Sequence, residues 1–204
     1  MGTRALIILS CCFVGITANA QIRIPPFDIE LKLHQSFFPG PGEEDGLEVF
    51  EATNLQGGLH WQISQHLALG GFYSRSIAAT AKYKGAWGST QTKNEYQQLV
   101  KGIDVRLSTG RAKKWRSFIA LNYSQIEIIE DNENYRLAAQ TGSFGASLGI
   151  MLKLSNKLYL NLIELNGQAV IDPPFWFNTD TDSNEIRTLV GAKMGLLYNI
   201  DFRK

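Results

Sequence analysis

The sequence predicts an all-β protein, namely an eight-stranded antiparallel up-and-down transmembrane β-barrel. Three observations predict this fold: a leader of the secretory type, eight segments in which apolar and polar residues alternate, and connections that are alternately short and long. The 204-residue chain contains 19 glycines and 11% aromatic residues, which suits curved strands and aromatic girdles at a membrane surface. We therefore expect one barrel domain over residues 21–204.

Residues 1–20 are predicted to be a cleaved signal peptide. Arg4 supplies a positive charge, residues 5–16 form an apolar core, and Ala18-Asn19-Ala20 is a small-x-small cleavage site. Cys11 and Cys12 leave open a lipoprotein cleavage box, although the apolar run before them is only about half as long as a usual signal core.

After cleavage the chain would hold no cysteine and a formal charge near zero, since the net charge of +1 includes Arg4. Disulfides and thiolate chemistry would then be absent, and nucleic acid is not an expected partner. No later stretch approaches the ~20 consecutive apolar residues of a membrane-spanning helix. Any passage through a bilayer would therefore use strands.

Each predicted strand has a period of two, which gives it one apolar and one polar face. The clearest strand covers residues 186–202, where the even positions are apolar from Val190 to Phe202 and the odd positions include Lys193 and Asp201. The strands before it are predicted over residues 27–37, 47–63, 67–83, 95–109, 115–130, 135–155 and 158–171.

The alternation assigns faces strand by strand. Lipid-facing positions are predicted as Ile29, Leu31 and Leu33 in the first strand, Leu55, Leu59 and Trp61 in the second, Leu99, Ile103 and Val105 in the fourth, and Phe144, Leu148 and Ile150 in the sixth. Arg75 and Lys101 fall on the same faces and require either a snorkelling side chain or a bulge that resets the register. The segment 158–171 alternates poorly, because Glu164 continues the row of its leucines, and its faces stay unassigned.

The connections between the strands fall into two groups. Short turns are predicted at residues 64–66, 110–114 and 156–157, and longer loops at 39–46, 84–94, 131–134 and 172–185. Short turns on one side and longer loops on the other are typical of a bacterial barrel with both termini in the periplasm.

The last strand also contains a polar-x-Gly-x-x-hydrophobic-x-hydrophobic string, formed by Lys193, Gly195, Tyr198 and Ile200 with Phe202 beyond them. It resembles the C-terminal signal by which the barrel-assembly machinery recognises outer-membrane proteins, although this chain ends on Arg203-Lys204 instead of an aromatic residue. The whole mature chain resembles the small eight-stranded outer-membrane barrels of the OmpA-, OmpX- and OmpW-like superfamily. The resemblance implies location in the bacterial outer membrane, with outer-membrane lipid and the assembly machinery as partners. It implies no particular solute or surface ligand.

A set of ionisable residues is predicted to line the lumen: Glu30, Lys32, His34, His60, Asp104, Arg106, Arg116, Arg187 and Lys193. Buried opposite charges must pair, or each costs several kcal/mol. The favoured interpretation is a plug of salt bridges that fills the narrow interior of an eight-stranded barrel. A lumen that binds a ligand or conducts ions is the alternative.

No catalytic, cofactor or metal site is predicted. His34 and His60 could face inward from neighbouring strands, whereas His66 falls in a turn at the other end, and no compact zinc-ligand spacing occurs. The alternating oxygens of residues 180–185 resemble a calcium loop, but the glycine and spaced glutamate of an EF-hand are missing. Serine, histidine and acidic residues occur without a nucleophile elbow, which argues against a hydrolase or a lipid-modifying barrel.

Two aromatic segments are expected at the membrane surfaces. Residues 175–177, Phe-Trp-Phe, suit an outer aromatic girdle or an adhesive patch, and Trp115 among Lys113, Lys114 and Arg116 suits head-group contact on the side of the short turns.

The sequence therefore predicts a non-enzymatic outer-membrane barrel with a membrane-structural or surface-interaction role and a largely plugged polar lumen. A narrow transport barrel for small or apolar solutes is one alternative. A soluble lipocalin-like carrier is the other, and it requires the opposite arrangement, with Glu30, Lys32, Arg187 and Lys193 facing solvent.

Overall fold

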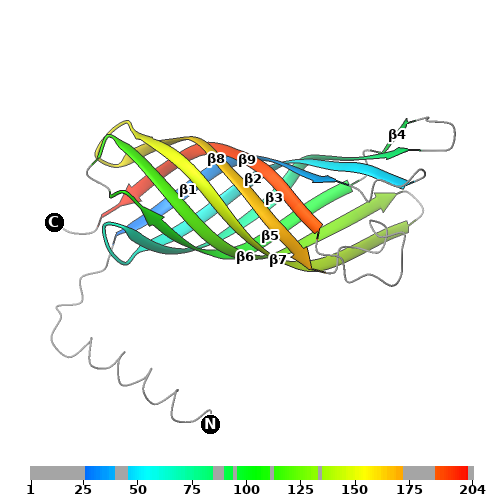
Figure 1. Cartoon of the computed structure of the whole chain (residues 1–204), viewed down its shortest axis with the longest axis horizontal. Coiled ribbons are helices and arrows are strands. Elements are labelled where there is room, and N and C mark those ends of the chain that lie inside the picture. The colour runs from blue at the N-terminus through cyan, green and yellow to red at the C-terminus, as the bar shows by residue number, and fades with distance from the viewer. Residues whose placement is uncertain are drawn as a thin grey trace, which may run out of the picture.

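The computed structural model of the chain describes residues 26–39, 46–84, 90–93, 96–110, 113–132, 135–171 and 187–201. These residues form one antiparallel sheet that closes into a barrel, without helices in the part described (Figure 1). The strands are β1 (Phe27–Pro39), β2 (Gly46–Gln62), β3 (Leu67–Lys84), β4 (Thr90–Lys93), β5 (Tyr96–Ser108), β6 (Trp115–Asn132), β7 (Tyr135–Lys153), β8 (Leu158–Ile171) and β9 (Arg187–Ile200).

Eight of these strands close the barrel, which confirms the predicted fold class. The closing pair is β1 with β9, in register from Phe27↔Ile200 to Phe37↔Val190, and the remaining neighbours follow chain order. Both described chain ends and the three short turns thus lie at one end, here called the turn end. The opposite end, where β4 lies in Figure 1, is called the loop end.

The predicted loop at 84–94 is in part wrong, because it contains β4. Thr90–Lys93 pairs with β3 in the register that β5 also follows, since Ala81↔Lys93 and Arg75↔Leu99 belong to one antiparallel ladder. The segment Thr-Gln-Thr-Lys is polar throughout, so it carries no apolar alternation by which a strand could be predicted.

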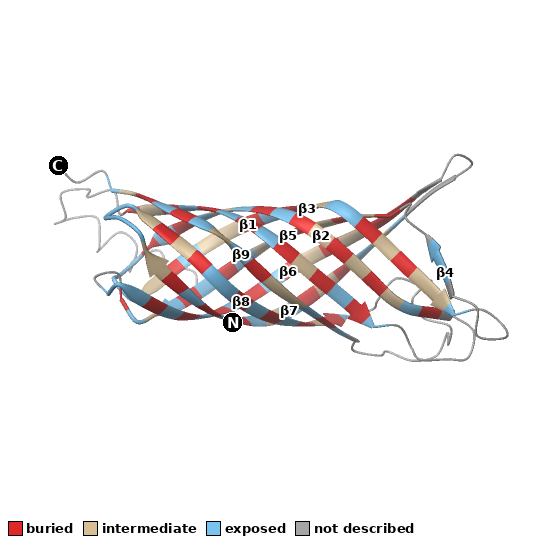
Figure 2. Ribbon diagram, turned by 90° about the horizontal axis from the view of Figure 1, so that it is seen from above, coloured by how far each residue is buried: buried red, intermediate tan, exposed pale blue. Residues whose placement is uncertain are grey.

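Burial alternates along the strands (Figure 2), and toward the turn end most large apolar residues lie outside and many polar residues inside. Leu31 is 54% exposed on the outer face, whereas its neighbour Lys32 is 2% exposed on the inner face. The described residues among the predicted outward positions of strands β1, β2, β5, β7 and β9 lie on the outer face. This arrangement is the reverse of a soluble barrel and matches the lipid-and-lumen alternation of transmembrane barrels.

A bulge explains the weak alternation of β8. The pairing of β8 with β9 shifts between Asn161 and Glu164, so Leu162 and Ile163 both lie outside and Glu164 turns inside. One extra residue in a strand reverses the faces that follow it. The simple alternation that placed Glu164 in the row of leucines is therefore corrected.

No bulge removes Arg75 or Lys101 from the outer face. β3 does carry an irregularity, because Asn54 pairs with Ser76 and Thr53 with Ala78, but it falls at Ile77, after Arg75. Both cations remain exposed outside the barrel, so the register-reset explanation is wrong for them.

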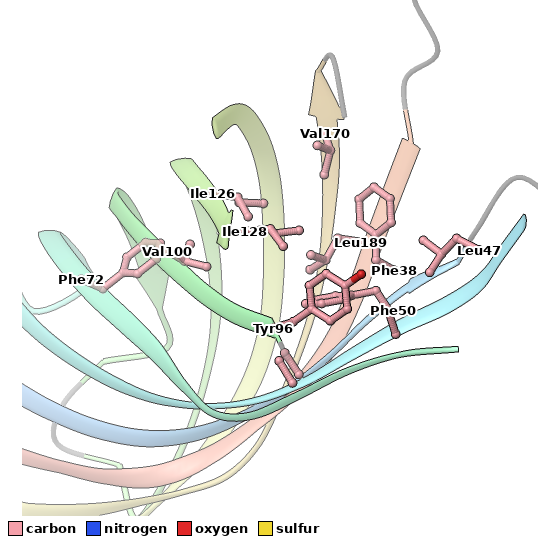
Figure 3. Close-up of a cluster of buried hydrophobic side chains, with 13 residues drawn as sticks. Phe38, Leu47, Phe50, Phe72, Tyr96, Val100, Ile126, Ile128, Val170 and Leu189 are labelled. Atoms are coloured by element: carbon pink, nitrogen blue, oxygen red, sulfur yellow. The ribbon is translucent and has the colours of Figure 1, made fainter. Parts of the chain in front are cut away.

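The interior is divided into two layers. The half nearer the turn end, the turn half, holds polar and charged side chains beside a small buried apolar cluster of Phe118, Ala120, Met151, Tyr159 and Leu197. The half nearer the loop end, the loop half, holds an apolar cluster (Figure 3). That cluster comprises Phe38, Leu47, Phe50, Ala52, Phe72, Ala79, Ala81, Tyr96, Val100, Ile126, Ile128, Val170 and Leu189.

Two of the three short turns show how the chain reverses at the turn end. Leu67 O accepts hydrogen bonds from Ile63 N at 3.0 Å and from Ser64 N at 3.1 Å, and Gly110 adopts a φ of 100°, which favours glycine. No helix among the described residues is long and apolar enough to cross a membrane. The predicted signal peptide at 1–20, the calcium-like segment at 180–185 and the aromatic segment at 175–177 lie outside the described residues.

Candidate functional site: the charge cluster inside the barrel

A bidentate ion pair forms the centre of the turn half. Arg106 on β5 donates from both terminal nitrogens to the carboxylate of Glu30 on β1, and the Nη2–Oε2 distance is 3.1 Å. Lys32, two residues along β1, places Nζ 2.6 Å from Glu30 Oε2. All three side chains are buried. One carboxylate therefore holds two cations that come from strands far apart in the chain.

Glu164 on β8 is the second carboxylate of the cluster. Its Oε2 lies 2.7 Å from Lys32 Nζ and accepts from Asn161 Nδ2 at 3.0 Å. Its Oε1 lies 3.5 Å from Lys193 Nζ on β9. The sequence prediction missed Glu164, because the bulge hides its face. The opposite charges of Glu164 and Lys193, which pair across β8 and β9, are the signal that could have revealed it.

His60 joins β2 to the cluster. Its Nε2 lies 2.8 Å from Asp104 Oδ1 and 3.2 Å from Arg106 Nη2, and Asp104 Oδ2 accepts from Arg106 at 3.3 Å. The ring fits only because β3 has a glycine beside it, since a Cβ at Gly70 would lie 2.1 Å from the imidazole. His60 thus has a fixed position between an acid and a guanidinium. Among the described residues, no hydroxyl group hydrogen-bonds to its ring as a nucleophile would.

The cluster is electrically balanced. It combines three carboxylates, Glu30, Asp104 and Glu164, with three permanent cations, Lys32, Arg106 and Lys193. Aromatic faces complete the enclosure, since the Arg106 guanidinium lies 4.7 Å from the Phe118 centroid and Lys193 Nζ 5.5 Å from the Phe72 centroid. Removing a single charge would leave its partner buried and uncompensated.

The other predicted lumen residues differ in their relation to this cluster. His34 borders it, buried opposite Lys193 in the β1–β9 register. Arg116 is buried inside β6 near the turn end, so it does not share the exposed surface of Lys113, Lys114 and Trp115. The side chain of Arg187 lies outside the described residues.

The described residues contain no group of three or more histidine, cysteine or acidic side chains able to hold a metal ion. His66 lies exposed in the first short turn, where its Nδ1 is 2.9 Å from the Ser108 carbonyl oxygen. That contact links the turn between β2 and β3 to the end of β5. The charge cluster therefore offers fixed, paired charges as its chemistry.

The residues of the proposed assembly signal lie on the strand that closes the barrel. Lys193 and Gly195 face inward on β9, Tyr198 is exposed outside, and Ile200 ends the strand beside Phe27. A Cβ at Gly195 would lie 2.1 Å from the Leu31 carbonyl oxygen, so β1 and β9 approach closely there. Phe202 lies outside the described residues.

The fold is similar to that of solved outer-membrane barrels. Neisserial surface protein A (NspA) has a TM-score of 0.58, with 8% identity over 86% of this chain and 97% of its own. OprG of Pseudomonas aeruginosa has a TM-score of 0.55, with 9% identity over 87% and 97%. The N-terminal β-barrel domain of OprF from the same organism has a TM-score of 0.53, with 10% identity over 85% and 97%. No protein-family model matches the sequence, and no curated protein matches it.

The chain thus has the fold of the small eight-stranded outer-membrane β-barrels. The expected resemblance is confirmed at the level of the fold. Sequence identities of 8–10% extend that likeness to the fold alone.

Proposed function

We propose that this protein is a non-enzymatic barrel of the bacterial outer membrane, with a largely plugged lumen and a membrane-structural or surface-interaction role. The observation that carries the proposal is the balanced charge cluster, which joins β1, β2, β5, β8 and β9 across the inside of the barrel. An eight-stranded barrel has an interior just wide enough for side chains to fill. We expect the paired charges and the apolar cluster above them to leave no continuous aqueous path.

The outer face supports placement in a membrane. Large apolar side chains stand exposed around the turn half, among them Leu31, Leu59, Ile103, Leu121 and Leu148. Exposed apolar area on this scale is unfavourable in water and favourable in lipid. A closed ladder also satisfies the backbone hydrogen bonds that lipid would leave unmade.

Two segments of the sequence would serve export and insertion into the outer membrane. Residues 1–20 would direct export and be removed, and the Lys193-to-Phe202 string would engage the barrel-assembly machinery. The loop end would then face outward and offer any surface contact. The lipocalin-like alternative receives no support from the turn half, because Glu30, Lys32 and Lys193 lie inside the barrel instead of in solvent.

Conductance in planar lipid bilayers tests the plug. We expect the folded wild-type protein to insert without steady ion conductance. Arg106→Ala removes the guanidinium that contacts Glu30, Asp104 and His60, and should produce measurable openings. Gly167→Leu, on the outer face of β8 where a Cβ meets nothing within 4 Å, is the control and should stay silent.

Steady conductance of the wild-type protein would contradict the plug and favour the narrow transport barrel. Folding of each variant is checked by its mobility on a denaturing gel, since a closed barrel unfolds slowly and migrates differently before and after boiling.

A further inference from the structure

A groove of about 800 Å³ crosses the outer face of β2 and β3. Its walls are Leu31, Leu55, Leu59, Tyr73 and Ile77, all exposed and apolar or aromatic. The groove lies on the outside of the barrel and is separate from the charge cluster inside.

Two glycines form the floor of this groove. A Cβ at Gly57 would meet nothing within 4 Å, and one at Gly71 would meet only the Gly102 carbonyl oxygen at 3.5 Å. Neither glycine is therefore required by crowding. Both leave an open furrow among leucines, in which an extended hydrocarbon chain can contact the backbone closely.

The side of the groove next to β5, called the charged end, is positively charged. Arg75 lines the groove between Tyr73 and Ile77 on β3, and Lys101 pairs with Tyr73 across β3 and β5. Among the described residues no carboxylate pairs with either cation, and the recorded partner of Arg75 is Gln97 Oε1 at 3.5 Å. By contrast, Lys82, on the same strand as Arg75, is paired: its Nζ lies 3.0 Å from Glu51 Oε1.

A small polar hollow adjoins the charged end. It is lined by Tyr73, Lys101, Gln125, Glu127 and Gln140, so Tyr73 separates it from the apolar groove. Amide and carboxylate side chains can exchange hydrogen bonds with sugar hydroxyls, and Arg75 and Lys101 can pair with phosphate. Apolar groove, cations and amide-lined hollow thus lie next to one another on the outer face, from β2 and β3 across β5 to β6 and β7.

We propose that this face binds a glycolipid of the outer leaflet whose head group carries phosphate. One acyl chain would occupy the furrow over Gly57 and Gly71, the phosphate would pair with Arg75 and Lys101, and the sugar would contact the hollow beside Tyr73. The site goes beyond the proposed plug, and it rests on the outer-membrane placement with the loop end outward.

Native mass spectrometry of the folded barrel tests the site, with bis-phosphorylated lipid A as the probe. Gly57→Leu should fill the furrow and weaken lipid A binding by about tenfold or more. Gly167→Leu is the matched control, because its Cβ also meets nothing within 4 Å on an exposed outer position. It should bind as the wild type does.

The charged end is tested with Arg75→Gln combined with Lys101→Gln. Loss of two charge-assisted contacts should weaken the binding of bis-phosphorylated lipid A by about tenfold or more. It should also reduce the difference in affinity between the bis-phosphorylated and the mono-phosphorylated forms. Lys82→Gln removes an outward cation that is already paired, and should leave binding unchanged.

Three results obtained with a wild type that binds lipid A would overturn the site. They are equal losses in Gly57→Leu and Gly167→Leu, full binding by the Arg75 and Lys101 double variant, and phosphatidylglycerol binding as tightly as lipid A. The last would assign the groove to an anionic phospholipid. If the wild-type protein failed to insert into vesicles, the membrane placement itself would be contradicted. If it inserted but did not bind lipid A, only the proposed site would be contradicted.

Discussion

The turn half and the loop half of this barrel have opposite polarity. On β6 in the turn half, Ile119 and Leu121 lie outside, and Asn122 faces inward beyond them. Farther along the same strand, Ile126 and Ile128 are buried inside, while Gln125 and Glu127 occupy the outer face. β2 changes in the same way, from His60 inside and Leu59 outside to Phe50 inside and Glu51 outside.

With the proposed outer-membrane placement, this difference is explained if one backbone ladder spans two solvation regimes. Lipid around the turn half favours apolar side chains outside and leaves polar groups to pair inside. Water around the loop half favours the reverse, which is the usual arrangement of a soluble barrel. The change lies near Tyr73, Tyr123 and Phe144, where the Tyr123 and Phe144 rings lie 4.8 Å apart. Aromatic rings concentrate at membrane–water interfaces, so we infer that the outer bilayer surface lies there.

The largest expected effect is at the charge cluster of the turn half. Glu164→Gln leaves Lys32 and Lys193 without their shared carboxylate and should cost about 3–5 kcal/mol of folding free energy. Equilibrium unfolding in lipid vesicles, followed by tryptophan fluorescence, measures it. A cost below about 1 kcal/mol would indicate that water reaches the cluster. The inside of the turn half would then not be a water-excluded region of paired charges.

The next effect concerns the outer face. Met194→Arg places a charge on the apolar surface of β9 and should cost about 2–4 kcal/mol in a membrane. Gln140→Arg, outside β7 in the loop half and opposite Glu127, should change stability by no more than about 0.5 kcal/mol. The same vesicle titration compares them. Equal costs would mean that both halves meet the same solvent.

A smaller effect is expected inside the loop half. Ile126→Val removes one methylene from a side chain that is 2% exposed and should cost about 0.5–1.5 kcal/mol through lost packing. Ile119→Val, on the outer face of the same strand, should cost less, because lipid fills the space left. If the order of the two variants were reversed, the apolar cluster would not be the packed core of the loop half.

The smallest effect is expected at the outer ion pair of the loop half. Glu51→Gln breaks the partly exposed contact with Lys82, and such pairs contribute about 0–1 kcal/mol. The loss should shrink further at high salt, because exposed charges are screened. A salt-independent cost near that of Glu164→Gln would show that this pair is enclosed and that the loop half is not wetted outside.

The strand pattern could be predicted from the sequence because successive side chains must point to opposite faces. The strand expected at 115–130 became Trp115–Asn132 and the one at 158–171 became Leu158–Ile171. The alternation alone, however, is unchanged when inside and outside are exchanged. On β6 most of the large apolar residues occupy odd positions up to Tyr123 and even positions from Ile126 on. This switch is visible in the sequence, and it marks where the apolar side chains move from the outside of the barrel to its inside.

The sequence by itself thus determined the eight strands of the barrel, the apolar and polar faces of β1, β2, β5, β7 and β9, and that residues such as Glu30, Lys32 and Arg106 belong to the polar faces. Only the tertiary structure decided which charges meet, because periodicity gives a side chain its face but not its height or its neighbour across the barrel. It also decided the face of Glu164, since a single-residue bulge reverses every later position. Pairing distances depend on strand stagger, which closure of the whole barrel fixes.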